Sequence, residues 1–224
     1  IVAHDLLFVL TGFTKQFENL VDTQVFALPD SLIGAETSTA GFAKYTNSAS
    51  GSAAGFEVTL QKHLTPRLSG RISYTYMKAR GTSSTAEDGY NVAVFGAPAT
   101  GGRDFPLSWD QRHSLIVDAR YESPAAEFTA LYRLFSPLPV TTPGSAVPND
   151  ARMSWRNILD LKVSVHTKRL LHGRLKPFFE LRNLFDEKNI INRPDDTGVR
   201  AYRLFDPINS NQGRRFRLGM TVDF

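Results

Sequence analysis

The sequence predicts an all-β protein, an antiparallel up-and-down β-barrel that crosses a membrane. Three observations predict it: apolar and polar residues alternate over long segments, the connections are alternately short and long, and aromatic residues lie near the expected strand ends. A period of two places successive side chains on opposite faces of a strand, so each strand has one apolar and one polar face.

The segment 215–224 shows this alternation most clearly. One face carries the apolar residues Phe216, Leu218, Met220, Val222 and Phe224. The other face carries Arg215, Arg217, Gly219, Thr221 and Asp223. Further strands are expected at 2–17, 56–64, 68–76, 109–122, 128–135, 159–165 and 175–183. The sequence therefore predicts about eight strands.

The lengths of the strands and connections favour a membrane barrel over a soluble β-sandwich. Several segments reach the roughly 9–11 residues that a tilted strand needs to cross a bilayer, whereas soluble strands usually have about 5–6. Short turns are expected at 65–67, 123–125 and 169–173, and long polar connections at 18–41, 81–108, 137–154 and 184–212. Bacterial outer-membrane barrels have short periplasmic turns and long extracellular loops.

The composition of the chain fits a barrel wall and excludes several other classes. No apolar run approaches the roughly 18–20 residues that a transmembrane helix needs. The chain has a net charge of +4 and a mean hydropathy of −0.23, and its basic residues are scattered, which argues against nucleic-acid binding. It has no cysteine, which excludes disulfides, thiolate catalysis and cysteine-based zinc sites.

Charged strand residues are expected to face the barrel interior, because a charge facing lipid near the midplane costs about 2–4 kcal/mol. The candidates for this interior wall are Arg71, Asp118, Arg120, Lys162, Arg182, Arg215 and Arg217. They either line a ligand route or solvate the interior and contact a plug. Aromatic residues expected at the two membrane interfaces are Tyr74, Tyr76, Trp109, Tyr121 and Trp155.

Enzymatic and metal-binding readings find little support in the sequence. His113 and Ser114 lie near Asp110, but neighbours in a strand point to opposite faces, so they do not form a nucleophile and base. The histidines His4, His63, His113, His166 and His172 have no metal-ligand spacing. Asp150, Asp195 and Asp196 offer calcium ligands, although ordinary turn chemistry explains them better. We expect no catalytic residue, no metal and no cofactor.

Five stretches of the chain resemble the C-terminal barrel region of TonB-dependent outer-membrane receptors. They are the Asn47 and Gly55–Glu57 pattern, the ascending strand 68–80, Asp110-Gln111-Arg112-His113, Asn183-Leu184-Phe185, and the last strand ending at Phe224. The Asp-Gln-Arg-His stretch resembles the Oar-like subgroup of these receptors. Together the five stretches span nearly the whole chain.

The resemblance implies a barrel of about 22 strands with a plugged lumen, of which residues 1–224 are the C-terminal portion. The N-terminal plug and the earlier strands would then lie outside this chain. It further implies energised uptake of a scarce ligand, a metal chelate or an oligomer, driven through TonB. Phe224 looks like the signal read by the outer-membrane assembly machinery, or else it is a final lipid-facing anchor.

Two other functions stay open at the level of sequence. One is a stand-alone eight-stranded outer-membrane barrel with a structural or adhesive role, and the other is a soluble β-sandwich binding module. The expected location is the bacterial outer membrane, with lipid, plug, TonB and assembly machinery as partners and with no nucleic acid.

Overall fold

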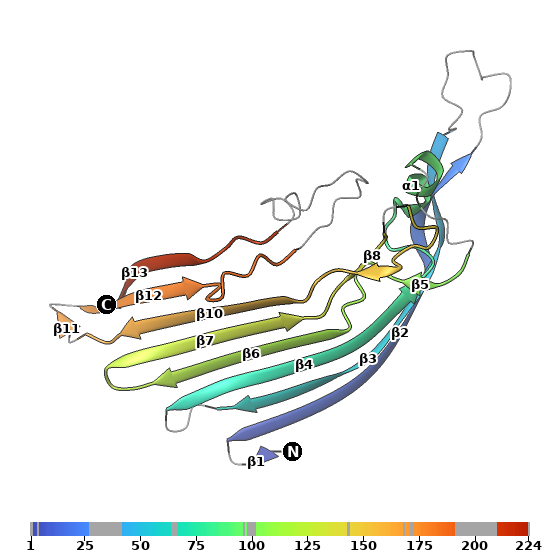
Figure 1. Ribbon diagram of the computed structural model, residues 1–224. Coiled ribbons are helices and arrows are strands. Elements are labelled where there is room, and N and C mark those ends of the chain that lie inside the picture. Colours follow the sequence, from blue (N-terminus) through green and yellow to red (C-terminus); the bar gives the residue numbers. More distant parts are fainter. Residues whose placement is uncertain are drawn as a thin grey trace.

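The computed structural model describes residues 2–3, 5–26, 42–63, 67–95, 97, 102–142, 144–167, 169–170, 173–190 and 210–223. Their eight long strands lie side by side in one curved sheet (Figure 1). The long strands are β2 (Leu6–Phe26), β3 (Phe42–Lys62), β4 (Leu68–Gly81), β6 (His113–Glu122), β7 (Ala126–Phe135), β10 (Arg156–Val165), β12 (Gly173–Arg182) and β13 (Arg215–Asp223). The short elements are β1 (Val2–Ala3), β5 (Phe105–Pro106), β8 (Pro139–Val140), β9 (Ala151–Arg152), β11 (Arg169–Leu170) and the helix α1 (Asp88–Phe95).

The sheet is an antiparallel meander in which each long strand pairs with the next long strand along the chain. Short connections join the strands at one end of the sheet, the turn end, and long connections join them at the other, the loop end (Figure 1). Among the described residues β2 and β13 do not pair with each other, so this sheet is open. The only other sheet among the described residues is the short pair of β8 (Pro139–Val140) with β9 (Ala151–Arg152), so these residues do not form a β-sandwich.

The register gives the sheet one apolar and one polar face, as the alternation predicts. Leu10, Val58, Tyr74, Leu115 and Leu134 are consecutive partners on the apolar face. The partners three residues along, Gln61, Arg71, Asp118 and Leu131, lie on the polar face. Large apolar side chains are widely exposed, and Leu218 on the apolar face is 81% exposed. Contact with lipid makes the exposure of these apolar side chains favourable.

The strands β2 and β3 extend further than the sequence predicts. Residues 18–26 and 42–55 are strand, so the expectation of a loop over 18–41 is wrong at its start, and residues 27–41 lie outside the described ranges. Each strand has 21 residues, about twice what a bilayer crossing needs. The register shifts between Phe17 and Leu20 and again between Leu20 and Asp22, with Asn19 at φ 57°, which interrupts the alternation there.

The connection between β4 and β6 contains the helix α1, which the sequence analysis missed. The helix lies against the loop end of β2, where the Gly89 N–H donates to Asp22 Oδ1 (3.1 Å) and the Thr23 hydroxyl donates to the Ala86 carbonyl (2.5 Å). A Cβ on Gly89 would lie 1.8 Å from the Thr23 carbonyl oxygen, so only glycine permits this approach. No helix in the described ranges is long and apolar enough to span a membrane.

A small dry core anchors the same connection to the sheet. Leu107 follows β5 and packs against Ala53 and Ala79, with Phe17 and Met77 beside them. The Leu107 N–H also donates to the Ala79 carbonyl (3.2 Å). Small residues on β3 and β4 leave room for the leucine, which fixes the loop on the polar face of the sheet.

The carboxylate of Asp110 completes the sheet where β6 begins. The pairing of β4 with β6 ends at Tyr76 and His113, and beyond it the Ala79 N–H donates to Asp110 Oδ1 (2.8 Å). Arg112 and Arg152 each donate to Asp110 Oδ2 (2.7 Å). Asp110 is fully buried, so these two guanidinium groups supply the neutralisation that a buried carboxylate needs.

Other polar side chains extend the strand ladder in the same way along the loop end. Gln111 donates to the Ser136 carbonyl, and the Ser136 hydroxyl accepts from the His113 N–H (2.9 Å). Further along, Asn189 both accepts from the Asn157 N–H (2.7 Å) and donates to its carbonyl (2.8 Å). The Asp-Gln-Arg-His stretch is thus a set of side chains that close the rim of the sheet.

Replacing Leu218 by arginine should impair assembly in the outer membrane, because the side chain would place a charge on the exposed apolar face at a cost of about 2–4 kcal/mol. Thr221→Arg on the polar face is the matched control and should be tolerated. The amount of heat-modifiable, folded protein in outer-membrane fractions measures both. Equal losses in the two variants would contradict the assignment of the faces.

Asp110→Ala should destabilise the barrel by about 3–5 kcal/mol, because it leaves the Ala79 N–H and two guanidinium groups without their acceptor. The urea midpoint of the refolded full-length protein is the measurement. Asp150→Ala, at an exposed hairpin carboxylate, should leave the midpoint close to that of the unaltered protein. A midpoint for Asp110→Ala equal to that of Asp150→Ala would show that Asp110 does not hold the rim together.

Candidate functional site on the polar face

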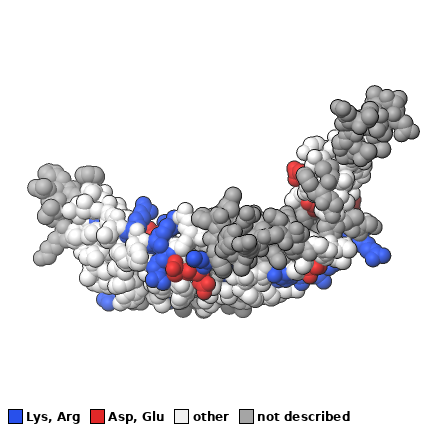
Figure 2. Space-filling model, turned by 45° about the horizontal axis from the view of Figure 1, so that its top comes forward, with Lys and Arg blue, Asp and Glu red and all other residues white. Residues whose placement is uncertain are grey.

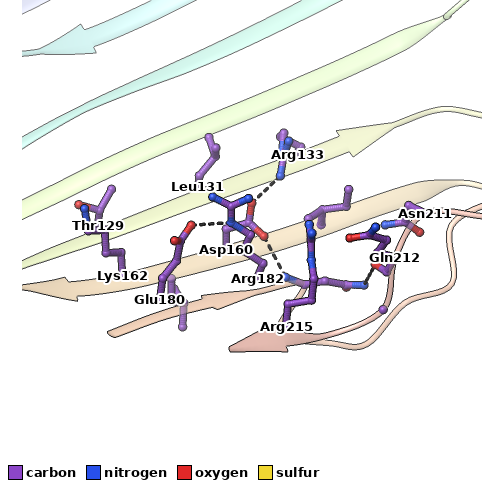
Figure 3. Close-up of a pocket in the computed structure, with 14 residues that line it drawn as sticks. Thr129, Leu131, Arg133, Asp160, Lys162, Glu180, Arg182, Asn211, Gln212 and Arg215 are labelled. Carbon is purple, nitrogen blue, oxygen red and sulfur yellow. Dashed lines mark hydrogen bonds and ion pairs between the residues drawn. The ribbon is translucent and has the colours of Figure 1, made fainter. Parts of the chain in front are cut away.

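The polar face has a hollow of ≈ 530 Å³ between β7, β10, β12 and β13. Figure 3 shows its charged side chains: Arg133, Asp160, Lys162, Glu180, Arg182 and Arg215. Arg182 ends β12 and Arg215 begins β13, so the hollow opens toward the loop end. Figure 2 shows basic and acidic side chains gathered close together in one part of the face in view.

The two acidic side chains of the hollow are already engaged. Asp160 Oδ2 accepts from Arg133 (2.5 Å), and Asp160 Oδ1 accepts from the Asn183 N–H (2.9 Å). Glu180 Oε1 accepts from Arg182 Nε (2.5 Å), and its Oε2 lies 3.5 Å from Arg217. Each carboxylate is thus bonded to an arginine, and Glu180 also faces Lys162 across β10 and β12.

An aromatic ring holds a lysine in place at the floor of the hollow. Phe178 projects on the polar face beside Gly219, where a Cβ would lie 2.4 Å from the ring. The Lys162 ammonium lies 4.7 Å from the ring centroid, and the Arg217 guanidinium lies 5.8 Å from it. Cation–π attraction therefore holds both cations against the wall.

The Asn-Leu-Phe stretch forms the upper edge of the hollow. Asn183 is almost fully buried, its amide donates to the carbonyls of Glu187 (2.9 Å) and Gln212 (3.3 Å), and it accepts from the Glu187 N–H (3.1 Å). Asn183 and Asp186 have φ values of 54° and 58°, a region that Asn and Asp tolerate better than most residues. This turn ends β12 and connects it to the segment before β13.

The structure brings together three of the seven residues predicted for the interior wall. Lys162, Arg182 and Arg215 line the hollow, and Arg217 lies beside it. Arg120 lies nearer the turn end and pairs with Glu122 (3.3 Å) and Glu127 (2.8 Å). Arg71 and Asp118 face each other across β4 and β6 beside a smaller hollow of ≈ 260 Å³. All seven lie on the polar face.

Three charged residues of the hollow were missed from the sequence: Arg133, Asp160 and Glu180. Leu131 shares the polar face with Arg133, and Phe178 shares it with Glu180, so both strands lack a clean alternation. The remaining signal was the spacing of two residues between Asp160 and Lys162 and between Glu180 and Arg182. That spacing shows that each pair shares a face but not which strands are neighbours.

Three of the residues predicted as interface aromatics cluster around His113 near the loop end. His113 Nδ1 is hydrogen-bonded to the Tyr74 hydroxyl (2.8 Å), and its ring lies 5.4 Å from that of Tyr76 and 6.2 Å from that of Trp155. Tyr121 lies near the turn end, 6.3 Å from Phe128, and Trp109 is exposed in the turn that precedes β6. His113 thus belongs to an aromatic cluster, in which the Tyr74 hydroxyl is its hydrogen-bond partner.

The other candidates for chemistry have ordinary structural explanations or lie outside the described ranges. The Thr142 N–H donates to the Asp150 carboxylate (2.7 Å) and lowers the pKa of that carboxyl, which is turn chemistry. Within the described part of the chain no group of three or more histidine or acidic residues could hold a metal ion. His4, His172, Asp195, Asp196 and Phe224 lie outside the described residues.

Comparison with solved structures finds the same fold in larger transport proteins. The chain matches the outer membrane transporter YddB of Escherichia coli with a TM-score of 0.67 and 12% identity. It matches the G324V mutant of the ferric enterobactin receptor PfeA of Pseudomonas aeruginosa with a TM-score of 0.65 and 16% identity. It matches the ferric-catecholate import receptor Fiu of Escherichia coli with a TM-score of 0.62 and 18% identity.

These matches cover 100% of this chain but only 31%, 29% and 26% of YddB, PfeA and Fiu, respectively. No protein-family model and no curated protein sequence matches the chain. The low identities make this a likeness of fold. The chain has the fold of the C-terminal barrel part of TonB-dependent outer-membrane receptors.

Proposed function

We propose that this chain is part of the barrel wall of an outer-membrane transporter that takes up a scarce ligand with energy delivered through TonB. The observation that carries the proposal is an open sheet whose apolar face is exposed. This sheet has the same fold as part of the barrel of much longer receptors. In hydrocarbon an unpaired strand edge leaves N–H and C=O groups without partners, at a cost of several kcal/mol each.

Strands outside residues 1–224 would then complete the barrel. β1 pairs with β2 only at Leu6 and Leu7, and the edge of β2 beyond Leu7 has no partner strand among the described residues. Further strands would pair with this edge and with β13, which gives a barrel of about 22 strands with room for a plug. The same free edges disfavour the stand-alone eight-stranded barrel.

The polar face would border the interior of this barrel. The charged residues Arg71, Asp118, Arg120, Lys162, Arg182, Arg215 and Arg217 would contact water, the plug or the ligand there. The apolar face would contact outer-membrane lipid, with the aromatic residues around His113 at the outer interface and Tyr121 at the inner one. This arrangement, a lipid-facing wall with a charged interior face, supports a role in transport.

The cargo of the matched proteins suggests what kind of ligand to test. Fiu and PfeA are receptors for ferric-catecholate and ferric enterobactin, by their descriptions. At 12–18% identity these ligands do not carry over to this chain. We propose the broader class, a metal chelate or an oligomer that is scarce outside the cell.

The test of energised transport uses the full-length gene product. It should contain a plug domain before the barrel, and the purified protein should bind the periplasmic domain of TonB. Deletion of the segment that precedes the plug should abolish this binding, while the barrel still folds. A full-length product without a plug, or TonB binding that survives the deletion, would refute the proposal.

Phe224 offers a second test, on assembly. Deletion of Phe224 should lower the amount of barrel inserted into the outer membrane, because the insertion machinery would lose the terminal aromatic of an amphipathic last strand. Asp223→Asn is the control, since it changes the neighbouring residue and leaves the aromatic in place. Unchanged insertion after the deletion would leave Phe224 only the role of a lipid-facing anchor.

A further inference from the structure

Two arginines face each other at the mouth of the hollow. Arg182 and Arg215 are direct partners across β12 and β13, on the polar face. Like charges in directly opposed positions of an antiparallel pair are destabilising. Glu180 is the nearest acidic group, but it already pairs with Arg182 and with Arg217. Arg215 forms no ion pair with any described residue.

The described residues that line the hollow carry a net positive charge. Four of them are basic, Arg133, Lys162, Arg182 and Arg215, and two are acidic, Asp160 and Glu180, an excess of two positive charges among the described lining residues. Lys162 lies over Phe178 and faces Glu180 across β10 and β12, a carboxylate that also pairs with Arg182 and Arg217. An excess of this size on a partly enclosed wall attracts anions.

An unused hydrogen-bond donor lies in the same wall. Arg133 Nε is buried and has no hydrogen-bond partner among the described residues, although its neighbouring nitrogen is bonded to Asp160. The Nε of Arg156, the next arginine along this face, is in the same state. Buried donors are normally satisfied, so two orphaned guanidinium donors on neighbouring strands need an explanation.

We propose that the hollow binds a small polyanion, a ligand with two or more carboxylate or phosphate groups, between Arg182, Arg215, Lys162 and Arg133. An anion between Arg182 and Arg215 removes the like-charge repulsion, and oxygen atoms match the fork of guanidinium donors. The volume of ≈ 530 Å³ lies within the range of about 300–1,000 Å³ that small-molecule sites have. This inference rests on the proposed function, in which the loop end faces the outside and the ligand arrives from there.

Equilibrium binding to the purified full-length protein in detergent tests the site without any energised step. The probes are citrate and inorganic pyrophosphate, with maltose as the neutral control, measured by titration calorimetry. Both polyanions should bind and maltose should not, and binding should weaken as the salt concentration rises. Failure of TonB binding leaves this measurement unaffected, so the two proposals fail separately.

Single variants locate the site. Arg182→Gln and Arg215→Gln should each weaken polyanion binding by about tenfold or more, because each removes a charged donor, while Arg215→Lys should retain part of the affinity. Lys78→Gln removes an equal charge from an exposed position on the other face and should leave the affinity within about twofold. Heat-modifiable migration on gels confirms that each variant is folded.

Two results would overturn the inference. The first is wild-type protein that is folded but binds neither polyanion, or binds both equally well after Arg182→Gln and Arg215→Gln. The second is unchanged affinity combined with a lower thermal midpoint in these two variants. That result would assign the basic groups to a carboxylate of the protein's own plug.

Discussion

In a bilayer every backbone amide and carbonyl must find its partner within the protein, and this constraint governs the structure. The long strands satisfy it by pairing with their neighbours in one antiparallel sheet. Where the ladder ends, side chains take the place of a neighbouring strand. The Asp110 carboxylate accepts from the Ala79 N–H, and the Asn189 amide accepts from the Asn157 N–H and donates to the Asn157 carbonyl. One of the stretches that give the chain its family resemblance, Asp110-Gln111-Arg112-His113, supplies such a replacement.

The same ladder determines the two faces. Because the side-chain period is two, pairing in register aligns most apolar residues on one side and most charged residues on the other. Lipid accepts the first side, and the second becomes a wall on which charges from four strands meet. The hollow arises there because the pairing of β10 with β12 brings Glu180 beside Asp160 and Lys162.

The charge pattern of that wall departs from what stability alone would favour. Arg182 opposite Arg215 and an unsatisfied Arg133 Nε both cost free energy in the isolated sheet. Proteins retain such local conflicts chiefly at functional sites. The Asp110 cluster, in contrast, has every group paired and is the part of the rim that holds the fold.

The sequence by itself determined the strands that cross the membrane, the faces they present and the order of short and long connections. These features depend on the alternation of apolar and polar side chains with a period of two, which contact with lipid requires. In 215–223 and 113–122 this alternation identified the strand residue by residue. Beyond the membrane both faces of a strand contact water, so the sequence there need not alternate. The continuation of β2 through Phe26 and the helix α1 were therefore not predictable. Only the tertiary structure decided the composition of the hollow. Register and neighbouring strands, which the order of residues along the chain does not specify, bring Arg133, Asp160 and Glu180 to Arg182 and Arg215.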